Sequence, residues 1–134
     1  MKYFRLSEFF NSAKAQELGI NNTTSDPAVI ANIETLVDNI LDPLREAWGK
    51  PITVNSGYRC AALNRAVCGS PSSQHTKGMA ADITTGNRAD NRRLFQMIVD
   101  MKLPYDQLIN EGGFSWIHVS HRADGENRGQ VFAL

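Results

Sequence analysis

The sequence predicts an α+β domain with a small antiparallel sheet flanked by helices. Helical periodicity dominates the first half of the chain, whereas short β-branched or alternating segments dominate the second half. Helices and strands that segregate in this way are typical of α+β folds. The 134 residues suffice for one hydrophobic core and are few for two. We therefore expect a single domain over residues 1–134.

Apolar residues recur at three- and four-residue steps in the segments that we expect to be helical. The clearest such segment begins at Asp26-Pro27, an N-cap followed by proline at the first helical position, and ends near Trp48. Pro43 lies inside it and indicates either a kink or a restart. The expected helices lie within residues 3–18 and over residues 27–48, 60–67 and 87–101.

Short segments bounded by glycine, proline or polar residues are expected to be strands. The last two are joined around Gly112-Gly113, which predicts a hairpin. The polar segment Arg122–Gly129 is expected to be a loop. The expected strands cover residues 52–56, 79–84, 107–109 and 116–120.

Composition excludes several classes of partner. Fourteen basic residues balance fourteen acidic ones, so electrostatics do not favour nucleic-acid binding. No apolar run approaches the ~20 residues that span a bilayer, and we expect no membrane span. The N-terminus lacks a signal-peptide pattern, which predicts synthesis in the cytoplasm.

The two cysteines are not expected to form a disulfide. Cys60 and Cys68 would lie about 12 Å apart on a helix, which is too far for a disulfide, so we expect two buried or half-buried thiols. Separately, we expect the protein to be a monomer.

Three residues form a candidate metal site: His75, Asp82 and His118. Strand alternation places His118 on the opposite face from its apolar neighbours Ile117 and Val119. Alternation also places Ala80 on the same face as Asp82, and the small alanine leaves space beside the carboxylate for His75. Two imidazoles and one carboxylate are a normal ligand set for catalytic Zn²⁺, which keeps an open position for water. The bound water then has a pKa near 7. The alternative interpretation is a surface hydrogen bond between a histidine and an aspartate.

Glu111 is the candidate base that would take a proton from this water. It ends one expected strand, and the hairpin at Gly112-Gly113 leads to the strand of His118. A solvated turn residue is the alternative for Glu111. His121 lies three residues after His118, so on a strand its side chain should face the other way. We expect it to be a tail residue, and a metal ligand or proton shuttle is the alternative interpretation.

Three motifs carry a family resemblance. Ser73-Gln74-His75-Thr76-Lys77-Gly78-Met79-Ala80-Ala81-Asp82 resembles the S-x-H-x-x-G-x-A-x-D motif of the M15 zinc peptidases, which include D-alanyl-D-alanine carboxypeptidases and phage L-alanyl-D-glutamate endolysins. Ser56-Gly57-Tyr58-Arg59 and Trp116-Ile117-His118 resemble the segments that precede and follow it. The resemblance covers about residues 50–121.

The resemblance implies the Hedgehog/D,D-peptidase fold and hydrolysis of peptidoglycan stem peptides. It implies His75, Asp82 and His118 as zinc ligands and Arg59 as the holder of a substrate carboxylate. Ser73 and Trp116 are further expected substrate contacts, with Tyr58 as another candidate for the cleft wall.

The base position departs from the common family patterns. Ser115 and Trp116 stand where many members have the glutamate of E-x-x-H or a histidine. Glu111 lies seven residues before His118, which resembles the longer spacing of the Hedgehog-like branch and of short phage members.

Two functions therefore stay open. One is a zinc peptidase acting at the cell wall after release or delivery: Arg59 favours a carboxypeptidase, and the small domain favours an endopeptidase such as a phage or prophage endolysin. The other is a catalytically inactive, zinc-stabilised module that binds the cell wall or a protein.

Overall fold

A five-stranded sheet forms the centre of the computed structural model, which describes residues 1–134. The strand order is β1-β2-β4-β3-β5; the first four strands pair antiparallel, and β5 pairs parallel to β3. The strands are β1 (Thr53–Ser56), β2 (Ala80–Thr84), β3 (Gln107–Glu111), β4 (Trp116–Ser120) and β5 (Gln130–Ala133).

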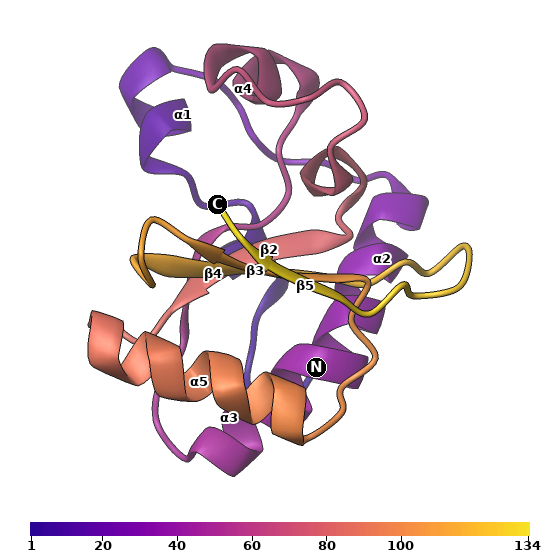
Figure 1. Cartoon of the computed structure of the whole chain (residues 1–134). Helices are drawn as coiled ribbons and strands as arrows, with labels where there is room; N and C mark the ends of the chain where they lie inside the picture. Colours follow the sequence, from indigo (N-terminus) through magenta and orange to yellow (C-terminus); the bar gives the residue numbers. More distant parts are fainter.

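Helices lie on both sides of this sheet. Figure 1 shows α3 and α5 on one side of it and α1 and α4 on the other. The helical segments are η1 (Leu6–Phe9), α1 (Ala13–Leu18), α2 (Pro27–Leu36), η2 (Val37–Leu41), α3 (Asp42–Trp48), α4 (Ala61–Ala66), η3 (Gln74–Lys77) and α5 (Arg88–Asp100).

The two faces of the sheet differ in chemistry because strand side chains alternate. Ile83 of β2 pairs with Ile117 of β4, and both are fully buried in a core of 18 residues shared with α2, η2, α3 and α5. Asp82 pairs with His118 on the opposite face. The apolar face therefore anchors the sheet to the helices and leaves the polar face for a site.

The helical predictions are confirmed in position but not in continuity. Residues 3–18 form two separate helices, because the Ser12 side chain accepts a hydrogen bond from Ala15 N and begins a new helix. The helix over 27–48 contains a π turn, in which Asp42 N donates to Val37 O. Pro43 has no N–H, and the wider turn accommodates it without ending the helical path.

The C-terminal edge corrects the prediction of a purely antiparallel sheet. The loop over 122–129 is confirmed, but β5 follows it as a parallel edge strand. All four of its residues are exposed, so no buried face marked it as a strand. Both cysteines are free; Cys60 is half-buried as expected, whereas Cys68 is exposed. None of the helices is both long and apolar enough to cross a bilayer.

Candidate metal centre

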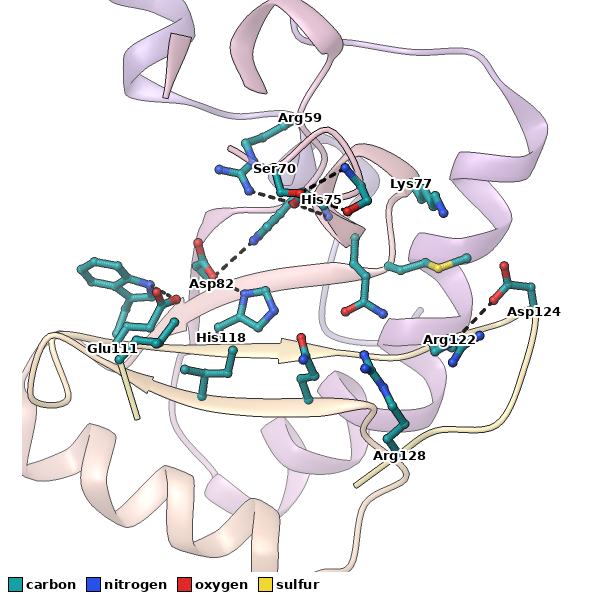
Figure 2. A pocket seen from close by; sticks show the side chains of 18 residues that line it. Arg59, Ser70, His75, Lys77, Asp82, Glu111, His118, Arg122, Asp124 and Arg128 are labelled. Atoms are coloured by element: carbon teal, nitrogen blue, oxygen red, sulfur yellow. Dashed lines mark hydrogen bonds and ion pairs between the residues drawn. The ribbon is translucent and has the colours of Figure 1, made fainter. Parts of the chain in front are cut away.

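His75, Asp82 and His118 converge on the polar face of the sheet. Asp82 Oδ1 lies 3.0 Å from His118 Nδ1 and 3.4 Å from His75 Nε2. One donor atom from each residue lies within 4.8 Å of the others. The two imidazole rings are edge-to-face, with centroids 5.1 Å apart. Residues separated by up to 43 positions thus form one cluster (Figure 2).

Backbone contacts orient the His75 ring. Its Nδ1 donates to the carbonyl of Gly57 over 2.7 Å, which leaves Nε2 with a lone pair facing Asp82. Gly78 ends η3 with φ +74°, and a Cβ there would lie 2.8 Å from Val29 O. Glycine is therefore required where the chain turns from His75 into β2, close to α2.

Asp82 is held in its charged form. Burial alone would raise its pKa, but hydrogen bonds with His118 and His75 lower the pKa below the usual range. Its side chain is only 17% exposed. A buried carboxylate needs compensating partners, and a cation held between Asp82 and the two imidazoles would supply positive charge there.

The donor set fits a zinc ion. Tetrahedral Zn²⁺ with bonds of about 2.0–2.2 Å places its ligand atoms roughly 3.3 Å apart. The Asp82–His118 and Asp82–His75 separations of 3.0 and 3.4 Å bracket this value, and all three ligand atoms lie within 4.8 Å of one another. Three protein ligands leave one position for water or substrate, and the cluster lines a cleft of about 700 Å³ that supplies access to it.

Glu111 lines the same cleft, at the end of β3. It pairs across the hairpin with Trp116, and Trp116 Nε1 donates to Glu111 Oε2 over 3.0 Å. One carboxylate oxygen is therefore held by the indole, while Oε1 makes no hydrogen bond to the protein. Trp116 also lines the cleft, as predicted for a wall residue.

Arg59 and Ser73 both line the cleft, and Ser73 is the N-cap residue of η3. Arg59 Nη2 donates to Ser73 Oγ over 3.1 Å, and Ser73 Oγ also accepts from His75 N. Burial lowers the pKa of Arg59, while Asp82 and Glu111 raise it, so the guanidinium stays charged. Arg59 Nε is buried without a partner.

Tyr58 and His121 lie outside both the cleft and the ligand cluster. Tyr58 packs edge-to-face on Phe10 and lines a separate pocket instead of the cleft. His121 follows β4 as expected for a tail residue; it does not belong to the ligand cluster, and its side chain is buried. Burial lowers the pKa of His121, and its Nδ1 has no partner.

Sequence analysis missed two features of the site. The Gly57 carbonyl orients a ligand, and only its place in the S-G-Y-R segment marks it. Asp106 is fully buried and joins Gln74 to Arg128, two side chains that line the cleft. An acidic residue beside an expected strand is a weak signal, since most such residues are solvated.

A family comparison agrees with this geometry. The family described as "Peptidase M15" matches residues 2–120, which include η3 and the three strands β2, β3 and β4 that carry the site residues. The chain belongs to the peptidase M15 family. Within this M15 chain, the match extends well before the motif-bearing part that the sequence indicated.

One curated relative is also similar to this M15 chain. The zinc D-Ala-D-Ala carboxypeptidase of Streptomyces albus G is 45% identical over 49 residues. These residues make up 36% of the chain but only 19% of the relative. The match therefore spans about a fifth of the relative's length.

Proposed function

We propose that the protein is a zinc peptidase that hydrolyses the stem peptides of bacterial peptidoglycan. The observation that carries the proposal is the convergence of three ligand atoms within 4.8 Å of one another at a cleft, in a chain of the M15 family. The name of the similar carboxypeptidase supports both the metal and the substrate class.

His75, Asp82 and His118 would hold the zinc ion. Zinc bound there would supply Lewis acidity, which polarises a scissile carbonyl and acidifies a water molecule. The protein's own contribution is orientation: the Gly57 carbonyl fixes the tautomer of His75, and the sheet register places Asp82 beside His118.

Glu111 would move the proton. Its free Oε1 would accept a proton from the attacking water and deliver it to the nitrogen of the departing amine as the peptide C–N bond breaks. The hydrogen bond from Trp116 Nε1 to Oε2 would keep the carboxylate oriented. The water oxygen ends in the new carboxyl group and the proton ends on the new amine.

Arg59 would bind a carboxylate of the substrate. A guanidinium forms paired hydrogen bonds with a carboxylate, and Ser73 restrains this one at Nη2. A group that captures a terminal carboxylate near the metal favours a carboxypeptidase over an endopeptidase. We therefore propose removal of a C-terminal residue as the first activity to test.

The test combines Glu111→Gln with product analysis. The wild-type protein with one zinc per chain should release a single amino acid from a defined stem pentapeptide, detected by mass spectrometry. Glu111→Gln should lower kcat by about 100-fold or more and keep the zinc, because proton transfer contributes factors of this size. Glu17→Gln, on the exposed surface of α1, is the matched control and should match the wild type.

Other outcomes are equally informative. A strong chelator should abolish hydrolysis, and added zinc should restore it. Full activity in Glu111→Gln would reject Glu111 as the base. If the zinc-loaded wild type binds peptidoglycan but releases no product, the inactive binding module is the correct interpretation.

A further inference from the structure

The cleft continues beyond the ligand cluster into a basic end, defined here by Lys77, Arg122 and Arg128. All three residues line the cleft. Figure 2 shows them on the opposite side of the ligand cluster from Glu111. They come from η3, the loop after β4 and the segment before β5, so three distant parts of the chain place positive charge at one end.

A buried carboxylate orients this end. The side chain of Asp106 is 0% exposed and accepts from Arg128 Nη2 at 2.8 Å, Arg128 Nε at 3.0 Å and Arg128 N at 2.9 Å. Its fourth donor is Gln74 Nε2 at 3.0 Å. Burying a carboxylate is unfavourable unless hydrogen-bond donors compensate it. Here the donors are two cleft side chains, which are thereby held in place.

The basic end keeps free donors after these contacts. Asp106 occupies the Nε and Nη2 atoms of Arg128 and leaves Nη1 without a partner in the protein. Lys77 Nζ makes no ion pair, and Arg122 reaches Asp124 only at 3.9 Å, between exposed side chains. Such a long, solvated pair is worth little, so both cations are available to an anionic group.

We propose that the basic end is a subsite for a second carboxylate of the substrate, carried by the peptide on the side of the metal away from Glu111. The inference rests on the proposed function, in which Arg59 holds a carboxylate near the scissile bond. A pre-oriented guanidinium and a nearby ammonium suit a carboxylate and would discriminate it from a neutral carboxamide. The cleft would therefore select peptides with an acidic residue before the scissile bond.

The experiment compares two stem pentapeptides that differ at one group. In one, the carboxylate of the glutamate residue is free; in the other, it is amidated. We expect the kcat/KM of the wild type to be about tenfold higher for the acidic peptide than for the amidated one, mainly because its KM is lower. A tenfold ratio corresponds to a difference of roughly 1.4 kcal/mol in binding free energy. Lys77→Gln and Arg128→Gln should bring this ratio close to one. Lys14→Gln, on α1 and outside the cleft, is the control and should keep the ratio.

Binding measurements separate this subsite from the proposed function. Calorimetric titration of the same two peptides into zinc-loaded Glu111→Gln, which should turn them over only slowly, should give a lower Kd for the acidic peptide. Hydrolysis of both peptides with equal kcat/KM would overturn the subsite and leave the peptidase function intact. If the wild type hydrolyses neither peptide but the acidic peptide still has the lower Kd, the peptidase function alone is overturned. If neither peptide is hydrolysed and their Kd values are equal, both proposals are overturned. If Arg128→Gln does not fold, Lys77→Gln still tests the subsite, because Lys77 is exposed and its substitution should leave the fold intact.

Discussion

At the scale of single residues, the hydrogen bond between Trp116 and Glu111 gives the tryptophan a role beyond that of a wall. Tryptophan has one N–H donor, and here it is directed at the carboxylate proposed to transfer the proton. The bond leaves one carboxylate oxygen free on the cleft side. The indole therefore restrains a carboxylate that matches neither of the common family patterns for the base position.

We predict that Trp116→Phe lowers kcat by roughly fivefold to tenfold, because it keeps an aromatic ring but removes a donor to a charged group. Zinc content should stay at one per chain, and KM should change less than kcat. Trp48→Phe, a partly buried position on α3, serves as the control for losing an indole. Equal kcat values for the two variants would show that the hydrogen bond has no influence on Glu111.

At the scale of secondary-structure elements, Asn91 joins α5 to both halves of the site. Its Nδ2 donates to the carbonyls of Phe114 and Ser115 in the β3–β4 turn, at 2.9 and 3.3 Å. Its Oδ1 accepts from Thr85 N at 2.7 Å, directly after β2. The side chain is 1% exposed. One amide thus ties the strand of Asp82 to the hairpin of Glu111.

Asn91→Ala should lower the free energy of unfolding by about 2–3 kcal/mol, since it leaves several buried groups without partners. Urea denaturation followed by circular dichroism measures this change. Asn39→Ala provides the comparison, because Asn39 is exposed and contacts only its own helix, so a loss below about 0.5 kcal/mol is expected. Similar losses at both positions would contradict the proposed structural role of Asn91.

At the scale of the whole molecule, Asp106 connects segments that are remote in the sequence. Its partners Arg128 and Gln74 lie 22 and 32 positions away. Hydrogen bonds from Arg128, opposed by burial and assisted by Gln74, lower the pKa of Asp106 to about 2 from the ordinary 3.8. The folded state therefore favours the charged form, and Asp106 stabilises the fold above the ordinary pKa.

This stabilisation should disappear as the pH falls from about 4 to 2, where the carboxyl becomes protonated in the folded protein. Because Arg128 is partly exposed, we expect a contribution on the order of 1 kcal/mol. Asp106→Asn should be less stable at neutral pH but lose less stability over this acid range. Urea unfolding between pH 2 and 5 tests the prediction, and parallel curves for variant and wild type would refute it.

Local pattern was sufficient for much of the fold and for the three residues of the candidate metal site. The N-cap at Asp26 and the apolar steps that follow predicted the long helical segment, because helix formation depends on nearby residues. Strand alternation placed Asp82 and His118 opposite the core. The same reasoning failed for β5, since a strand whose residues are all exposed has no apolar alternation to detect.

The sequence by itself determined which side chains are candidate metal ligands and on which sheet face Asp82 and His118 lie, because both follow from residue type and a two-residue period. Only the tertiary structure decided that His75 donates to the Gly57 carbonyl, that Trp116 restrains Glu111, and that Asp106 orients Arg128. These contacts depend on register and chain reversal. The packing of the whole molecule sets both, and no local periodicity encodes them.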